Sequence, residues 1–330
     1  MDKTTVLVIG DVAFDVFMAP QIGETLPQMR AEEKYICFPY GDKIPVEHLE
    51  SFPGGNATNV SIGLQRLDIP STILTTIGTD NISKVIFGEL QHEDVGMEYV
   101  TVQAGISSNY STIISYQGER TIFTYHAPKK YVYEKIDPLP PYIYLTSMGE
   151  RFLPYYQELI NHLIESPKII LMFNPGSLQK RAPIEDIHMV LKRTNILFVN
   201  REEAETFSEV SNSEGKEKEI LQVLQKLGPK TVIMTDNEKG VYGTDGTHYV
   251  HMSIIPVTVL EKTGAGDSFN SGFIAAILKG LSFEKALQWG TMNAASVIGY
   301  VGAQKGLLHT KDIDSWSRMF DNAKVTTEEL

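Results

Sequence analysis

A glycine-rich segment that ends in a carboxylate is the part of this chain best suited to chemistry. Residues 263–267 read Thr-Gly-Ala-Gly-Asp, and apolar residues at helical spacing follow directly. The N–H groups of Gly264, Ala265 and Gly266 would then lie at a helix N-terminus, which favours an anion. They could hold a phosphoryl group in transfer while Asp267 takes the proton of an acceptor hydroxyl. The alternative is an ordinary helix start, because Asp is a common N-cap and Gly is common in turns.

A second glycine-containing segment lies far upstream. Residues 53–59 read Pro-Gly-Gly-Asn-Ala-Thr-Asn, again just before an apolar helical stripe. Gly54 and Gly55 allow the backbone to approach a ligand closely, while the amides of Asn56 and Asn59 can both donate and accept hydrogen bonds. Helix capping by Asn56 is the simpler alternative.

Together the two segments closely resemble the hallmark regions of the ribokinase-like (PfkB-type) carbohydrate kinases. Those regions are Gly-Gly-x-x-x-Asn near the N-terminus and Asp-x-Thr-Gly-Ala-Gly-Asp near the C-terminus. The resemblance spans nearly the whole chain through further motifs in the same order, namely Gly10-Asp11 with Asp15, and residues 77–80, 200–204 and 235–240. It implies an ATP-dependent kinase that transfers a phosphoryl group from a magnesium-bound nucleotide to a small hydroxylated substrate.

The resemblance also assigns roles to individual residues. It makes Asp267 the general base and Gly264, Ala265 and Gly266 the anion hole. Asn200 and Glu203 match an Asn-x-x-Glu motif that organises Mg²⁺, although Asn200 would equally suit a helix cap. The expected nucleotide contacts are Asn200, Glu203, Thr235, Asn237, Gly240, Thr263, Gly264, Gly266 and Asn293. Asn237 departs from the family, which usually has Gly there, and apolar neighbours of Asn293 also favour a packing role.

At the acceptor end, carboxylates and amides suit the hydroxyl groups of a neutral polyol. The residues that match acceptor-binding positions are Asp11, Asp15, Gly54, Gly55, Asn56 and Asn59, with Asp267 beside them. Asn174 is added because it follows a predicted strand, and open α/β sheets bind ligands at the C-terminal ends of their strands. For Asp15, a position on the surface of a lid is the alternative.

A second departure from the family lies just before the anion hole. The family usually has Asp six positions before the catalytic Asp, followed by Thr or Pro, and this chain has Glu261 and Lys262. In relatives that acid helps to build a monovalent cation site. Glu261 is therefore a candidate ligand for K⁺, while Glu203 is the candidate for Mg²⁺.

Composition narrows the class of protein. The chain has 330 residues, of which 42% are hydrophobic, and a formal net charge of −12. The acidic balance argues against nucleic acid or an anionic membrane surface as partner. No apolar run reaches the roughly 20 residues of a membrane span, and the N-terminus has no signal peptide pattern. The single cysteine fits a reducing compartment, so we expect a cytoplasmic enzyme.

Alternating strand and helix patterns predict the fold class. Strands are expected at residues 5–9, 72–77, 142–146, 168–173, 196–200 and 231–235, with helices at 82–92, 153–165 and 216–227 among others. This predicts a three-layer α/β/α fold with a mostly parallel central sheet. Residues 110–116 and 120–126 predict a hairpin around residues 117–119.

We expect one kinase domain over residues 1–330, with a small β lid built from about 12–52 and 105–128. The alternative is that the lid strands are extra strands of the core sheet. A homodimer could form through the lid.

The hallmark motifs leave the acceptor open. A free sugar, in a ribokinase- or fructokinase-like reaction, is the first expectation, and a nucleoside is the alternative. Tyr35, Phe38, Tyr40, Phe123 and Tyr125 could stack on a nucleobase. A sugar phosphate would need a basic pocket, for which Arg120, Lys129 and Lys130 are available. A catalytically idle sugar-binding regulatory protein is the rival of another class, and the intact Asp267 argues against it.

Overall fold

The computed structural model describes residues 4–21, 35–116, 119–211, 213–320 and 325–329. The predicted turn at Gln117 and Gly118 lies outside the described residues, as do residues 22–34 of the predicted lid. No helix within the described ranges is long and apolar enough to cross a membrane.

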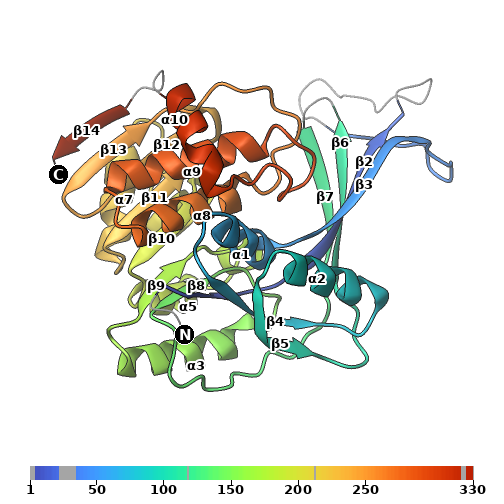
Figure 1. The fold of residues 1–330 in the computed structure, drawn as a ribbon, viewed down its shortest axis with the longest axis horizontal. Coiled ribbons are helices and arrows are strands. Elements are labelled where there is room, and N and C mark those ends of the chain that lie inside the picture. The colour runs from blue at the N-terminus through green and yellow to red at the C-terminus, as the bar shows by residue number, and fades with distance from the viewer. Residues whose placement is uncertain (1–3, 22–34, 117–118, 212, 321–324, 330) are drawn as a thin grey trace.

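A large, mostly parallel sheet forms the middle of the molecule (Figure 1). In the described part of the chain it has ten strands, in the order β14-β13-β12-β11-β10-β9-β8-β1-β4-β5. Pairing is parallel from β5 to β11 and antiparallel through β12, β13 and β14. The bounds are β1 (Val6–Ile9), β4 (Ser71–Ile77), β5 (Gly96–Val102), β8 (Tyr142–Leu145), β9 (Ile170–Phe173), β10 (Ile196–Asn200), β11 (Thr231–Thr235), β12 (Val241–Thr244), β13 (His248–Met252) and β14 (Val325–Glu329).

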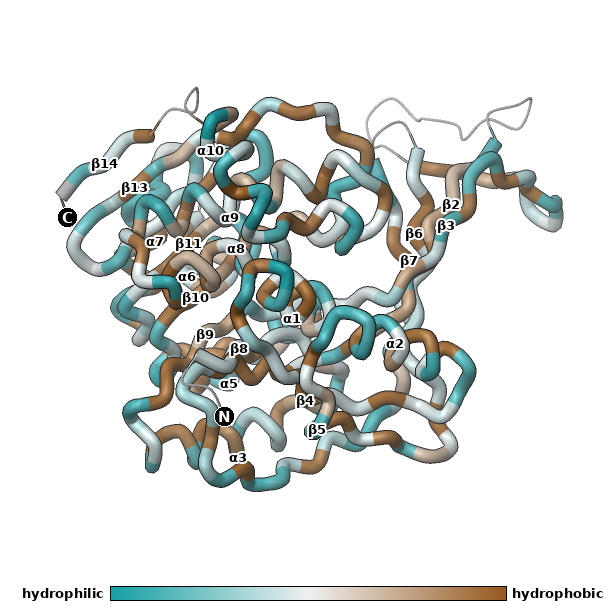
Figure 2. The backbone as a smooth tube through the Cα atoms, in the orientation of Figure 1, coloured by the Kyte–Doolittle hydropathy of each residue, from teal (hydrophilic) through white to brown (hydrophobic). Residues whose placement is uncertain are grey.

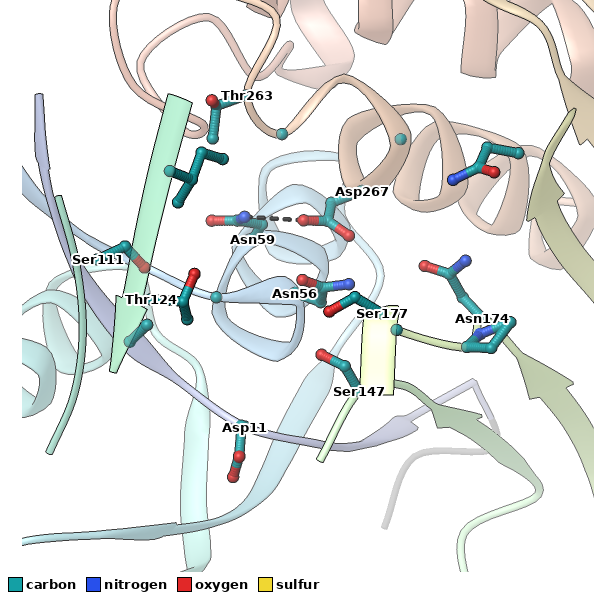
Figure 3. Close-up of a pocket in the computed structure, with 18 of the residues that line it drawn as sticks. Asp11, Asn56, Asn59, Ser111, Thr124, Ser147, Asn174, Ser177, Thr263 and Asp267 are labelled. Carbon is teal, nitrogen blue, oxygen red and sulfur yellow. Dashed lines mark hydrogen bonds between the residues drawn. The ribbon is translucent and has the colours of Figure 1, made fainter. Parts of the chain in front are cut away.

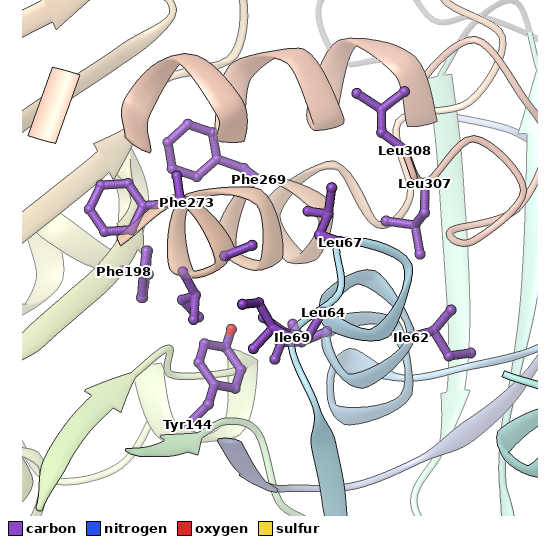
Figure 4. Close-up of a cluster of buried hydrophobic side chains, with 14 of the residues drawn as sticks. Ile62, Leu64, Leu67, Ile69, Tyr144, Phe198, Phe269, Phe273, Leu307 and Leu308 are labelled. Atoms are coloured by element: carbon purple, nitrogen blue, oxygen red, sulfur yellow. The ribbon is translucent and has the colours of Figure 1, made fainter. Parts of the chain in front are cut away.

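Helices cover both faces of this sheet, and each face has its own buried apolar cluster. One cluster joins the sheet to α1 (Asn56–Arg66), α2 (Asn81–His92), α8 (Ala265–Leu278), α9 (Phe283–Val297) and α10 (Ile313–Phe320) (Figure 4). The other joins it to α3 (Phe152–Glu165), α5 (Ile184–Leu191), α6 (Arg201–Ser208) and α7 (Glu217–Lys226). The predicted three-layer α/β/α architecture is confirmed.

A separate, smaller sheet projects from one side of the large sheet (Figure 1). Its strands are β2 (Ala13–Pro20), β3 (Val46–Gly54), β6 (Asn109–Tyr116) and β7 (Glu119–Tyr125), in the order β3-β2-β6-β7 among the described residues. β2 pairs with β6 in parallel, and the other two pairings are antiparallel. Hydrophobic residues recur along β6 and β7 (Figure 2). These strands form their own sheet and are not extra strands of the large one.

Candidate active site

A cavity of about 420 Å³ lies between the small sheet and the C-terminal edge of the large sheet. Polar residues at the ends of successive parallel strands meet there, including Asn174 after β9, Asn200 at the end of β10 and Thr235 at the end of β11. The N-termini of α1 and α8 face the same space (Figure 3). This is the edge at which open α/β sheets bind ligands.

Most of the residues expected from the sequence line this cavity. They are Asp11, Asp15, Gly55, Asn56, Asn59, Asn174, Asn200, Glu203, Thr235, Thr263, Gly264, Ala265, Gly266 and Asp267. Five others are not among its lining residues, namely Gly54, Asn237, Gly240, Glu261 and Asn293.

The N-terminus of α8 holds Asp267 toward the cavity. Gly264 caps the helix with φ of 83°, a left-handed conformation, and a Cβ built there would lie 2.3 Å from Cβ of Ala303. Only glycine fits both constraints. The N–H groups of Gly264, Gly266 and Asp267 have no hydrogen-bond partner within the described part of the chain, whereas Ala265 N–H donates to the Lys262 carbonyl at 3.3 Å. Of the three expected donors, Gly264 and Gly266 therefore keep a free N–H group and Ala265 does not, while Asp267 adds another.

Helix α1 fixes the carboxylate of Asp267. Asn59 Nδ2 donates to Asp267 Oδ2 at 2.8 Å, and Gln304 Nε2 donates to Asn59 Oδ1 at 2.9 Å, so both ends of the Asn59 amide are used (Figure 3). The two helices approach closely because Gly63 faces Ser271, whose Oγ would lie 2.3 Å from a Cβ at residue 63. Asn59 thus positions Asp267, and because it also lines the cavity, its contact with the acceptor stays a prediction.

Burial changes the proton affinity of two carboxylates that line the cavity, Asp15 and Asp267. The pKa of Asp267 is raised to about 6, mainly by desolvation, with the hydrogen bond from Asn59 opposing the rise and the nearby Asp15 charge adding to it. Desolvation likewise raises the pKa of Asp15 to about 6, opposed by a hydrogen bond from Ser111. Asp15 is 7% exposed, so it does not occupy a surface position. A base with a pKa near 6 is unprotonated at neutral pH and still accepts a proton well.

Gly54 packs directly against the carboxylate of Asp15. A Cβ at residue 54 would lie 2.1 Å from Asp15 Oδ2, so the absence of a side chain makes room for the carboxylate. Gly55, with φ of 86°, turns the chain into α1, and a Cβ there would meet the backbone of residues 11–13. Asn56 is the first residue of α1, and Gly55 rather than Asn56 is its cap.

The side chain of Asp11 is already satisfied within the protein. Its Oδ1 accepts from Lys129 Nζ at 2.9 Å, and its Oδ2 accepts from Tyr131 OH at 2.7 Å and Gly149 N at 3.0 Å. The side chain of Lys129 is fully buried, and the Asp11 carboxylate points away from Asp267 (Figure 3). Asp11 lines the cavity while this ion pair engages its carboxylate, so its contact with acceptor hydroxyls stays a prediction.

Asn200 and Glu203 form a reciprocal cap at the start of α6. Asn200 Oδ1 accepts from Glu203 N, and Glu203 Oε2 accepts from Asn200 N, each at 2.9 Å. The expected cap and the expected ligand role are compatible for Glu203, because its Oε1 lies outside this box, whereas the single side-chain oxygen of Asn200 accepts within it. Desolvation raises the pKa of Glu203 to about 7. Within the described residues, no group of three or more His, Cys, Asp or Glu side chains is arranged to hold a metal ion.

Three of the expected nucleotide contacts lie elsewhere. Asn237 has φ of 44°, so it adopts the left-handed conformation that Gly commonly supplies. Gly240, with φ of 92°, packs against the Met252 carbonyl. Asn293 is 0% exposed, and its amide donates to the Ser268 carbonyl and Ser271 Oγ and accepts from Leu308 N. For Asn293 the packing role replaces the expected contact.

Several lining residues escaped the sequence reasoning. They are Asn109, Ser111 and Thr124 on the small sheet, Ser147 after β8, and Asn270 on α8. The alternation of Asn109, Ser111 and Ile113 along β6 is the available signal, because alternate residues of a strand share one face.

Comparison with known proteins agrees with this geometry. The family model for pfkB family carbohydrate kinases matches residues 17–311. The chain belongs to this family. It is therefore a kinase, a phosphotransferase that acts on an alcohol group.

Individual relatives match between 80% and 97% of the chain. The ATP-dependent 6-phosphofructokinase of Thermoanaerobacterium thermosaccharolyticum is 25% identical over 97% of this chain and 98% of its own. The nucleoside kinase of Methanocaldococcus jannaschii is 25% identical over 80% and 85%. Arabidopsis thaliana ribokinase complexed with ribose and ATP superposes with a TM-score of 0.75 at 18% identity, over 95% and 98%. The last likeness confirms the ribokinase fold.

Proposed function

We propose that this protein transfers the γ-phosphoryl group of ATP to a hydroxyl of a small free sugar. The observation that supports this best is the carboxylate of Asp267. It lies at the N-terminus of α8 beside free N–H groups, it is oriented by Asn59, and it lines one cavity together with Asp15. The N–H groups of Gly264 and Gly266 would neutralise charge on the moving phosphoryl group, and Asp267 would accept the proton of the hydroxyl.

The acceptor would bind against the inner face of the small sheet, which acts as a lid in this proposal. Asp15, Ser111 and Thr124 line the cavity from that face, and Asn56 adds an amide from α1. Each of these groups can hydrogen-bond a hydroxyl, and a site of this kind discriminates against analogues that lack one.

The nucleoside alternative has less support. Of the five aromatic residues that could stack on a base, none is among the cavity's lining residues. Register explains this for two of them, because Phe123 and Tyr125 alternate with Ile122 and Thr124, which line the cavity. Strand alternation therefore puts Phe123 and Tyr125 on the outer face, away from an acceptor.

ATP is proposed as donor because the 6-phosphofructokinase relative is described as ATP-dependent and the ribokinase neighbour was solved with ATP. Asn200 and Glu203 would hold Mg²⁺, which supplies positive charge beside the phosphates. The donor set fits, since Glu203 is a buried carboxylate with a raised pKa and one oxygen outside the cap. Chelator should abolish activity, and Mg²⁺ should restore it.

Potassium beside Glu261 stays a prediction of the resemblance. Glu261 Oε1 accepts from Thr263 and Oε2 accepts from Ser115, which occupies both oxygens within the chain. Equal rates in potassium and in a bulky organic cation would eliminate the monovalent site. A cytoplasmic location is part of the proposal, because ATP is the donor and Cys37 is a free, exposed thiol.

A homodimer through the outer face of the small sheet is also proposed. Phe123 is 60% exposed, Tyr125 48% and Leu49 66%, which is an unusual apolar surface for a free sheet face. A second copy of the chain could bury it in an isologous contact. Light scattering should give twice the monomer mass for the parent and the monomer mass for Phe123→Asp. A monomeric parent protein would remove this part of the proposal.

One assay tests the acceptor. The purified protein is incubated with magnesium and ATP against free sugars, nucleosides and sugar phosphates, and ADP release is measured by a coupled enzyme. A free sugar should give the highest kcat/KM. Turnover with nucleosides alone would show a nucleoside kinase instead of a sugar kinase. Binding of sugars without any turnover would favour a regulatory protein.

A further inference from the structure

The segment that leads into the anion hole is tied to the small sheet by one buried carboxylate. Glu261 has a side chain that is only 4% exposed. On one side its Oε1 accepts from Thr263 N at 3.0 Å and from Thr263 Oγ1 at 2.9 Å. On the other side its Oε2 accepts from Ser115 Oγ at 2.8 Å, at the end of β6. Thr263 directly precedes Gly264, so one side chain joins the small sheet to the start of the anion hole.

Two ion pairs surround this link. Arg120 Nε lies 3.6 Å from Glu261 Oε1, and Arg120 is the partner of Ser115 in the pairing of β6 with β7. Lys262 Nζ lies 3.5 Å from Glu119 Oε1. Adjacent residues of opposite charge on β7 thus meet adjacent residues of opposite charge in the loop. The pair with Glu119 is the more exposed of the two, so solvent screens it more strongly.

Burial makes the Glu261 carboxylate depend on its partners. An ionised carboxylate away from water is costly unless donors surround it. Here two hydrogen bonds come from the loop, and one hydrogen bond and one ion pair come from the small sheet. If the small sheet moved away, Glu261 would lose Ser115 and Arg120 and would turn toward water, and its hold on Thr263 would weaken.

We propose that Glu261 is a positioning residue that sets the anion hole only while the small sheet is docked. The acceptor would bind under the small sheet. Docking of that sheet over a bound acceptor would therefore also complete the anion hole. The inference rests on the proposed kinase function of this site. It means that Ser115 and Glu261 raise the rate of phosphoryl transfer although neither residue lines the cavity.

Ser115→Ala is the sharpest test, because it removes one hydrogen bond to Glu261 without touching the cavity. We expect kcat to fall about tenfold, as for the loss of one hydrogen bond to a charged group, with little change in the KM for acceptor. Glu261→Gln should lower kcat at least as much. The double variant should be no worse than Glu261→Gln alone, because Ser115 acts through Glu261. Ser51→Ala, at an exposed position of β3 in the same sheet, is the matched control and should keep the parent kcat.

A second measurement does not need turnover. Hydrogen exchange at the amides of Thr263 and Ala265, which are hydrogen-bonded in the parent, should be faster in Ser115→Ala than in the parent and unchanged in Ser51→Ala. The inference is overturned if Ser115→Ala keeps the parent kcat and exchange, or if its effect multiplies with that of Glu261→Gln. A parent protein without kinase activity would refute the proposed function, whereas the exchange result would still decide whether Glu261 and Ser115 hold the loop.

Discussion

Replacement of Asp267 by Asn should have opposite effects on catalysis and on stability. The amide keeps the size of the side chain, and its oxygen can still accept the hydrogen bond from Asn59. It cannot act as a base, so kcat should fall by about 10²–10⁴-fold while ATP binding remains. Initial rates by coupled ADP release and nucleotide binding by calorimetry measure the two effects.

The same substitution should stabilise the folded protein. The pKa of Asp267 rises from its ordinary value of 3.8 to about 6, mainly because burial penalises the charge. This rise corresponds to a penalty of about 3 kcal/mol in the free energy of unfolding at neutral pH. Since the folded pKa is the higher one, the penalty is absent below about pH 4 and complete above about pH 6. Asp267→Asn should therefore raise Tm at pH 7.5 and leave it nearly unchanged at pH 4.

A control and the pH profile complete this test. Asp245 lies in the β12–β13 turn, where hydrogen bonds from His248 and Thr247 outweigh desolvation and lower its pKa. Asp245→Asn should leave kcat at the parent value and should lower Tm. In the parent, kcat/KM should fall as pH drops below about 6, because the base becomes protonated. Near-normal kcat in Asp267→Asn, or a lower Tm at pH 7.5, would refute the reasoning.

Three further predictions follow from the surroundings of the site. Gly264→Val should lower both Tm and kcat, because residue 264 has a left-handed φ and a Cβ there clashes with Ala303. Gly266→Val should lower kcat by about 10²-fold at unchanged Tm, since a Cβ at residue 266 meets only open space. Thermal melting followed by circular dichroism and initial rates of ATP turnover measure the two effects, and an equal loss of Tm in both variants would contradict the reasoning. Asp15→Asn should raise the KM for the sugar with little effect on that for ATP, which steady-state kinetics will show. Asp11→Ala should lower the free energy of unfolding in urea by about 3–5 kcal/mol, because Lys129 loses its partner. A normal unfolding midpoint with a raised KM for the sugar would instead support contact between Asp11 and the acceptor.

Local signals in the sequence determined much of the fold. The apolar runs at residues 196–200 and 231–235 coincide with β10 and β11, and the predicted helix at 153–165 differs from α3 by one residue. Such elements are legible because each is set by its own periodicity and end residues. Residues 283–297, which form α9, gave no comparable signal. This helix is buried around most of its circumference and includes Gly290 and Asn293, so no clear polar face marks it.

Only the tertiary structure decided which polar side chains remain available to a ligand. Asn59 and Asp267 are far apart in sequence and 2.8 Å apart in space, as the two glycine-rich segments implied. Asp11 and Asn293 have equally suitable side chains, yet Lys129 and Leu308 use their hydrogen-bonding capacity. The sequence determines what chemistry a side chain can perform. Whether that side chain stays available to a ligand depends on long-range packing, because a buried polar group must find a donor or acceptor wherever the fold provides one.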